Sequence, residues 1–280
     1  MNYYNISILG SPLEPFTYQS PQNINIGSKV NVSVRNRVVD GVVVSSSKKP
    51  DFDTNEILEA TEFFYSAKQL ESAQFISSYY VCSLGDALSL MTPFSHLQTK
   101  LESKSADEAK SAIILSSKQE KALAFLRQHK ISLLFGDTGS GKTEIYMKYF
   151  ERMIYENKRS VFLMPEISLT PQMALRLEEH FGESVVMWHS KLTPLQKRKA
   201  MEKIYNGQAK IIAGPRSALF LPIYDLGLIV VDEEHDDSYK SSSRPRYNAR
   251  DIAIYMGKLY DAPVVLGSAT PSLTSYSKFP

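Results

Sequence analysis

The chain has 280 residues, 43% hydrophobic and 22% charged, which is the balance of a folded chain and not of a disordered one. Its 32 Lys and Arg against 30 Asp and Glu give a net charge of +2, which does not imply wholesale electrostatic binding to nucleic acid or membrane, so any basic surface must be local. The single cysteine, Cys82, excludes an internal disulfide. No apolar run approaches the ~18 residues that span a bilayer, and no basic residue precedes Lys29, so we expect a cytoplasmic protein.

The first stretch, residues 1–97, predicts a small β domain followed by helices, and the length of the chain favours two domains. Residues 3–9 and 29–44 carry β-branched side chains at alternate positions, broken by polar turns, which indicates an antiparallel β unit. From 56 to 90 the apolar spacing lengthens toward a helical pattern. Residues 98–112 are polar and without strong periodicity, the composition of a linker or a solvated helix, so we place the linker between the two domains there.

Residues 113–280 have the pattern of an α/β domain. Short apolar runs alternate with amphipathic stretches such as 144–155. Buried strands that alternate with helices describe a parallel sheet covered on both faces. The runs lie at 131–135, 161–164, 185–187, 211–212, 228–231 and 264–266.

A phosphate-binding loop follows the strand expected at 131–135, because the sequence there matches G-x-x-x-x-G-K-[ST]. Glycines let backbone N–H groups close around phosphate oxygens, and the helix that follows adds the positive end of its dipole. Lys142 would neutralise the β- and γ-phosphates, and Thr143 would ligate Mg²⁺. A chance match has odds on the order of one per cent. The loop consists of Gly136, Asp137, Thr138, Gly139, Ser140, Gly141, Lys142 and Thr143.

An acidic motif, 232–235, ends the run at 228–231. In a nucleotide hydrolase one carboxylate holds Mg²⁺ and a neighbour deprotonates the attacking water, tasks that suit Asp232 and Glu233 respectively. Alone, the motif could be a solvated acidic turn, but a phosphate loop 90 residues earlier favours the catalytic interpretation. His235 either senses the γ-phosphate or caps the strand.

These motifs and the segments around them resemble superfamily 2 helicases and, among them, the replication-restart helicases. Gln119 stands 17 residues before the phosphate loop, where the resemblance implies a glutamine that reads adenine. The resemblance implies a RecA-like lobe at 113–280 and an ATP- and Mg²⁺-dependent 3′→5′ DNA helicase that recognises stalled forks and starts primosome assembly. The other similar segments are 164–172, 188–190, 214–222, 232–235 and 267–273.

Polar side chains at strand ends are candidates for gripping DNA phosphates without reading sequence. The loop at 239–251 mixes cations with tyrosines, which can hold phosphate and stack bases. The resemblance implies that this loop couples DNA binding to hydrolysis, and that His235, Ser268 and Thr270 relay the state of the γ-phosphate. A solvated loop, and a surface ion pair for Arg216, are the plainer alternatives. The expected DNA contacts are Thr170, Gln172, Arg216, Ser217, Tyr239, Lys240, Arg246, Tyr247 and Arg250.

The amino-terminal stretch resembles the same family more weakly, through 15–18, 27–30 and 41–44. The resemblance implies a small β-rich, OB-like domain that binds the 3′ end of a nascent strand. Thr17 stands where the family has an aspartate that recognises the 3′ hydroxyl, and Arg35 falls near a position that is typically glycine. Recognition of a 3′ end through Thr17 is therefore left open.

The family also has a second RecA-like lobe that supplies arginines to the ATP cleft, and a zinc-binding cysteine insertion. Residues 1–280 contain neither. We expect the chain alone to bind ATP weakly and DNA modestly, to hydrolyse slowly, and not to unwind. By resemblance, its partners are forked or single-stranded DNA, single-strand-binding protein and primosome loading proteins, with no membrane partner. Its location would be the cytoplasm, in association with the nucleoid.

Two other classes of function compete with a helicase. One is a P-loop ATPase or kinase that does not act on nucleic acid, although the GTPase Asn-Lys-x-Asp and the transporter Leu-Ser-Gly-Gly signatures are missing. The other is a DNA-binding module with an idle nucleotide pocket. Intact Lys142, Thr143 and the Asp232–Glu233 pair argue against that module.

Overall fold

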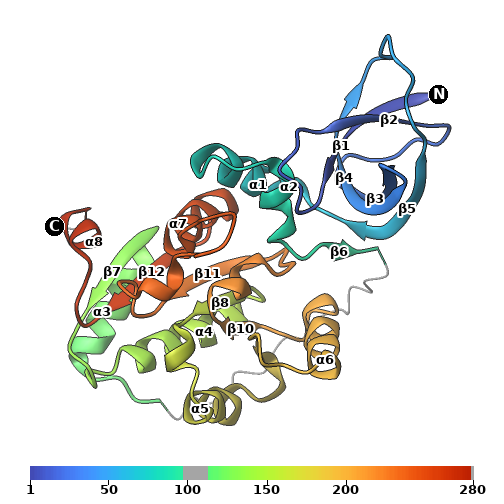
Figure 1. Cartoon of the computed structure of the whole chain (residues 1–280). Helices are drawn as coiled ribbons and strands as arrows, with labels where there is room; N and C mark the ends of the chain where they lie inside the picture. Colours follow the sequence, from blue (N-terminus) through green and yellow to red (C-terminus); the bar gives the residue numbers. More distant parts are fainter. Residues whose placement is uncertain (97–112, 279–280) are drawn as a thin grey trace. The chain divides into compact units, whose positions relative to one another are not determined.

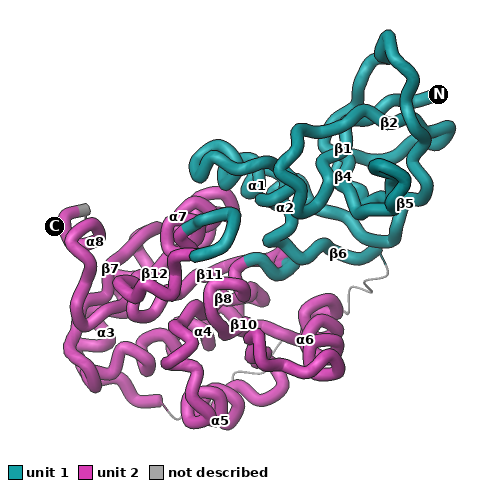
Figure 2. Tube along the Cα trace, in the orientation of Figure 1, with its two compact units in different colours: residues 1–98, 220–222, 242–247 teal, residues 99–219, 223–241, 248–280 magenta. Residues whose placement is uncertain are grey.

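The computed structural model describes residues 1–96 and 113–278 and divides the chain into two compact units (Figures 1 and 2). The first unit comprises residues 1–98, 220–222 and 242–247, and the second comprises 99–219, 223–241 and 248–280. The linker expected at 98–112 lies outside the described residues. Within the described part of the chain, no helix combines the length and the apolar character that crossing a membrane requires.

The first unit contains the antiparallel sheet that the alternating residues predict. Its strand order is β2-β1-β4-β3-β5-β6. Alternate residues of a strand face the same side of a sheet, and one side of this sheet forms the core. Ile6, Val30 and Val43, from three different strands, are fully buried there. The strands are β1(Asn2–Ile8), β2(Phe16–Ser20), β3(Ser28–Val34), β4(Arg37–Ser47), β5(Ile57–Phe64) and β6(Phe94–Ser95).

The hairpin between β3 and β4 turns on Arg35 and Asn36, whose φ angles are +49° and +62°. Two-residue turns with positive φ match the twist of the flanking strands. Glycine adopts this left-handed backbone without steric cost, whereas arginine does not. The turn therefore gives a physical reason for the glycine that the resemblance implies near Arg35.

The helical pattern expected from residue 56 is wrong over 57–64, which form strand β5. This strand pairs antiparallel with β3, for example Val30 with Ala60. Pairing with a neighbouring strand overrides local spacing, because strand preference depends strongly on context. The helices begin later, with α1(Ala67–Tyr79) capped by Ser66 and α2(Leu84–Ser89) capped by Ser83.

The second unit contains the expected parallel sheet, in the order β7-β12-β11-β8-β10-β9. Its four central strands consist almost entirely of buried residues, as in a sheet covered on both faces. The strands are β7(Ile131–Phe135), β8(Arg159–Leu163), β9(Val185–Met187), β10(Ile211–Gly214), β11(Leu226–Val231) and β12(Val264–Ser268).

The helices of the second unit cover both faces of this sheet. Right-handed crossovers that run in opposite directions along the strand order place α4 and α5 on one face and α7 on the other (Figure 1). Phe150 of α4 and Leu177 of α5 share one core cluster with Phe162 of β8. The helices are α3(Ser117–Gln128), α4(Lys142–Tyr155), α5(Pro171–Phe181), α6(Pro194–Tyr205), α7(Ala249–Tyr260) and α8(Leu273–Lys278), with 3₁₀ turns η1(Glu166–Ser168), η2(Gly182–Ser184), η3(Arg216–Phe220) and η4(Asp237–Tyr239).

Candidate active site

The phosphate loop leaves β7 and closes onto the start of α4. Gly139 and Gly141 have φ angles of +79° and +84°, a conformation that favours glycine. Lys142 follows as the first residue of α4, and its Nζ donates to the carbonyl oxygens of Gly136 at 2.7 Å and Asp137 at 3.3 Å. The lysine thus folds back over the loop that precedes it.

Gln119 lies beside this loop. It completes a capping box with Ser116 at the start of α3, and its Nε2 donates to the carbonyl oxygen of Gly141 at 3.2 Å. The residue expected to read adenine therefore contacts the loop expected to hold the phosphates.

A cavity of about 230 Å³ opens over the loop. Lys142, Thr143 and Asp232 all line it, although Asp232 lies 90 residues further along the chain and on another strand end. A hydroxyl and a carboxylate beside a lysine form a donor set that suits Mg²⁺ and phosphate. The lining residues are Thr138, Gly139, Gly141, Lys142, Thr143, Glu144, Arg176, Asp232 and Glu233.

Three hydrogen bonds fix Asp232 at the end of β11. Its Oδ1 accepts from the Tyr146 hydroxyl at 3.1 Å, its carbonyl oxygen accepts from the Tyr239 hydroxyl at 2.5 Å, and its N–H donates to Leu163 at 2.9 Å. Burial raises the pKa of Asp232 to about 6, and the neighbouring charge of Glu233 adds to this effect. The carboxyl is therefore costly to ionise without a cation.

Glu233 adopts a left-handed backbone, with φ at +46°. A non-glycine residue in this region carries a strain of about 1 kcal/mol or more, and such residues cluster at functional sites. Its carboxylate lines the cavity, and its Oε2 lies 3.6 Å from Nδ1 of His235. The residue expected to activate water is thus held in a strained turn at the cavity wall.

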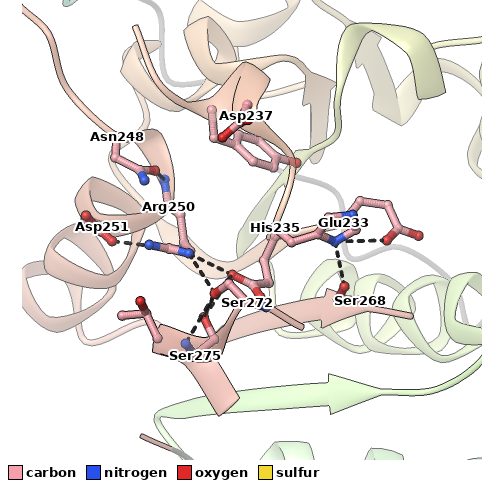
Figure 3. A network of polar contacts seen from close by, with 12 residues as sticks. Glu233, His235, Asp237, Asn248, Arg250, Asp251, Ser268, Ser272 and Ser275 are labelled. Carbon is pink, nitrogen blue, oxygen red and sulfur yellow. Dashed lines mark hydrogen bonds and ion pairs between the residues drawn. The ribbon is translucent and has the colours of Figure 1, made fainter. Parts of the chain in front are cut away.

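The three residues expected to relay the nucleotide state lie within contact distance of one another, and Figure 3 shows two of them, His235 and Ser268. Nδ1 of His235 lies 2.8 Å from the hydroxyl oxygen of Ser268, and Nε2 lies 3.3 Å from that of Thr270. Ser268 ends β12 and also accepts, through its carbonyl oxygen, from the N–H of Gly136. Contacts therefore connect the acidic motif, the end of β12 and the phosphate loop.

Glu234 forms a buried polar network that the sequence did not reveal. The residue is 2% exposed, and its carboxylate accepts from Arg250 Nη1 at 2.9 Å, from Ser272 N–H at 2.7 Å and from the Ser275 hydroxyl at 2.8 Å. Figure 3 shows Arg250 directed toward Ser272 and Ser275. The network ties the acidic motif to α7 and to the segment after β12. Arg250 was expected to contact DNA, and its burial against Glu234 does not fit that role.

The expected DNA contacts at strand ends fall into two groups. Gln172 and Ser217 are exposed, and Thr170 is exposed while its hydroxyl caps α5 by accepting from Met173 N–H. Arg216 instead donates through Nη1 to the carbonyl oxygens of Ser238 at 2.9 Å and Lys240 at 2.8 Å. This arginine braces the backbone of the loop after the acidic motif.

The loop from 239 to 251 places its tyrosines inside the protein. Tyr239 is 1% exposed and Tyr247 is 5% exposed, and the ring of Tyr247 packs edge-on against Phe220 at 5.3 Å. This burial does not fit the stacking on DNA bases expected of both rings. Lys240 and Arg246 are exposed, so the accessible cations of this loop can still meet phosphates.

Comparison with protein families identifies the class of protein as a helicase. Residues 116–279 match the model of the DEAD/DEAH box helicases, which is more than half of the chain, and the chain belongs to this family. Residues 8–93 match the model of a 3′ DNA-binding domain (3′BD). The expectation of a RecA-like helicase domain after a β-rich region is confirmed.

Two sequence relatives point to the replication-restart helicases within this family. The chain is 45% identical over 280 residues to the replication restart protein PriA of Helicobacter pylori, covering 100% of this chain and 44% of that protein. It is 36% identical over 269 residues to PriA of Rickettsia conorii, covering 93% and 42% respectively. The helicase domain of Pyrococcus furiosus Hef aligns with a TM-score of 0.42 and 23% identity, over 55% of this chain and 32% of that one. The resemblance to replication-restart helicases is confirmed, and the chain spans under half the length of these curated relatives.

Proposed function

We propose that the second unit binds ATP with Mg²⁺ and that the chain is part of an ATP-dependent 3′→5′ DNA helicase. The observation that supports this most strongly is that Thr143 and Asp232, distant in sequence, line one cavity with Lys142. Lys142 would neutralise the β- and γ-phosphates, and Thr143 and Asp232 would hold Mg²⁺, which offsets the charge of the phosphate oxygens. Glu233 would orient the attacking water and accept its proton.

The proposed substrate is forked or single-stranded DNA, and the first unit would hold a 3′ end. The match of residues 8–93 to a 3′ DNA-binding domain supports this assignment. A cavity of about 570 Å³ in this unit is lined by Phe16, Arg35 and Arg37 among others, and it combines an aromatic ring with two cations. Thr17 lies outside that lining and donates to Asn5 Oδ1 at 3.0 Å. We therefore assign the DNA contact to the arginines and the phenylalanine, not to Thr17.

The relatives' name supports a role in replication restart. In that role the protein would recognise stalled forks and start primosome assembly. Single-strand-binding protein and primosome loading proteins would be its protein partners, in the cytoplasm at the nucleoid. In the family, a second RecA-like lobe supplies an arginine to the ATP cleft, which is typically worth ~10³–10⁵ in rate for this chemistry. We therefore expect these 280 residues by themselves to turn ATP over slowly.

The test is ATP binding and turnover with and without forked DNA, for the wild type and for Lys142→Ala. Hydrogen bonds to charged groups contribute about 1.5–3 kcal/mol, so we expect Lys142→Ala to weaken ATP binding roughly 10- to 100-fold and to abolish stimulation by DNA. Exposed Lys121 on α3 supplies the control, Lys121→Ala. Turnover indifferent to DNA would favour a P-loop enzyme that does not act on nucleic acid. DNA binding without turnover in any longer protein that contains the chain would favour a module with an idle pocket.

A further inference from the structure

We infer that Tyr146 is a positioning residue, whose hydroxyl holds the Asp232 carboxylate in the orientation that binds Mg²⁺ beside Thr143. The inference rests on the proposed function and deepens it. It proposes that a side chain of α4 orients the metal-binding carboxylate. This side chain belongs neither to the phosphate loop nor to the acidic motif.

The hydroxyl of Tyr146 is committed to Asp232 by its surroundings. The residue is 1% exposed, and its ring meets Phe162 edge-on at 5.7 Å. A buried tyrosine hydroxyl needs a partner within the protein, because water cannot reach it. The hydroxyl donates to Oδ1 of Asp232 at 3.1 Å. A phenylalanine would keep the ring but leave Asp232 Oδ1 without this donor, so the hydroxyl serves the carboxylate.

Gly267 on β12 provides the space for this contact. A Cβ atom at position 267 would lie 1.7 Å from the Tyr146 hydroxyl oxygen and 3.2 Å from Oδ1 of Asp232. Its φ angle is not in the left-handed region, so the backbone itself does not require glycine. The absent side chain is what allows the hydroxyl and the carboxylate to meet.

The contact leaves Asp232 little freedom. Its backbone is held by the Tyr239 hydroxyl and by Leu163, and its Oδ1 by Tyr146. With one carboxylate oxygen occupied on the protein side, the other is the natural ligand for a cation in the cavity that Thr143 also lines. Partners that orient a metal-binding carboxylate typically contribute 10- to 100-fold in metal affinity.

The test measures binding of a fluorescent ATP analogue to the chain, in a Mg²⁺ titration and in EDTA. For Tyr146→Phe we expect the Mg²⁺ concentration at half-maximal binding to rise about 10- to 100-fold, with binding in EDTA unchanged. A purely structural role would lower binding in both conditions alike. Tyr149→Phe is the matched control, because Tyr149 is 3% exposed on the same helix and does not line the cavity.

A second variant keeps the inference testable if packing changes. Gly267→Ala should shift the Mg²⁺ dependence in the same direction, and by less in a Tyr146→Phe background. The new Cβ would lie 1.7 Å from the Tyr146 hydroxyl oxygen, but without that hydroxyl the nearest atom is the ring carbon Cζ at 2.9 Å. Additive effects of the two substitutions would contradict the shared contact. An unchanged Mg²⁺ dependence of Tyr146→Phe, beside a wild type that needs Mg²⁺, overturns this inference alone. A wild type that binds no nucleotide in either condition overturns the proposed function as well.

Discussion

The two sheets gather their polar residues in different ways. In the parallel sheet of the second unit, neighbouring strands end at the same edge, so residues after β7, β11 and β12 meet in one place. In the antiparallel sheet of the first unit, neighbouring strands end at opposite edges, and the cavity there is lined by the β1–β2 connection and the β3–β4 hairpin. Topology fixes the location of a site in the first case, whereas loop sequence fixes it in the second.

One ion pair in each unit illustrates a difference in burial. Glu234 has a fully buried side chain paired with Arg250, whose side chain is 14% exposed. The Lys29–Asp40 pair of the first unit has side chains 20% and 45% exposed. Buried pairs are costly to break because the remaining charge is left without compensation, whereas surface pairs contribute little. The comparison predicts that stability will respond very differently to charge removal at these two pairs.

The largest expected effect is on stability, from Arg250→Ala. Loss of one partner of a buried pair costs about 3–5 kcal/mol, so the free energy of unfolding of the second unit should fall by that amount. Denaturant titration followed by fluorescence of Trp188, the single tryptophan, reports on this unit. Arg198→Ala, at a pair whose side chains are 72% and 64% exposed, is the control and should change stability by less than about 1 kcal/mol.

The same titration of Lys29→Ala, followed by the fluorescence of a label on Cys82, the single cysteine, measures the first unit. We expect a loss of about 1 kcal/mol or less. Equal losses for Arg250→Ala and Lys29→Ala would contradict the contrast between the buried pair and the surface pair.

The second effect is a gain of stability that depends on pH, from Asp232→Asn. The folded carboxyl keeps its proton up to a pKa of about 6, while the unfolded one releases it near 3.8. The unfolded state binds fewer protons between these values, so the wild type loses stability as the pH rises from about 4 to 6, and the amide does not. The variant should therefore be more stable by about 2–3 kcal/mol at pH 8. Thermal unfolding at pH 8 and pH 5 checks this, and a gain that does not shrink at pH 5 would count against the raised pKa.

A smaller effect, on binding and not on stability, concerns the first unit, through Arg35→Ala combined with Arg37→Ala. If these cations meet DNA phosphates at the cavity, their loss should weaken binding of single-stranded DNA with a free 3′ end roughly tenfold, or about 1.4 kcal/mol. It should also reduce the salt dependence of binding, by about one unit of slope for each lost contact. Nucleotide binding should not change, because neither arginine lines the nucleotide cavity. If the wild type and the double variant bound DNA with the same salt dependence, these arginines would not contact DNA phosphates.

The sequence predicted that Thr143 and Asp232 would lie together, for a physical reason. A phosphate loop and an acidic motif that each follow a buried strand of one parallel sheet must meet at its carboxyl edge, and Thr143 and Asp232 do line one cavity. Strand β5 was missed because its pairing with β3 lies in the tertiary structure and not in its own spacing.

Side-chain direction was harder to predict than location. Three consecutive acids at 232–234 look alike in sequence, yet the turn at Glu233 sends Glu234 into a buried network. Tyr239 and Tyr247 in a polar loop suggested exposed rings, because sequence does not reveal which residues a loop packs beneath it. Tyr146 did leave a signal, since a tyrosine within the apolar stripe of a helix requires a partner for its hydroxyl.

The bonds from the Lys142 ammonium group to Gly136 and Asp137 have a consequence for how nucleotide enters. With these two carbonyl oxygens as acceptors, the cation is solvated by its own loop, which can hold its shape before any phosphate arrives. Such preorganisation spares the entropy of ordering the loop on binding. If the proposed nucleotide binds here, its phosphate would compete with two backbone carbonyl oxygens for the ammonium group. Its entry would then exchange the acceptors of one lysine.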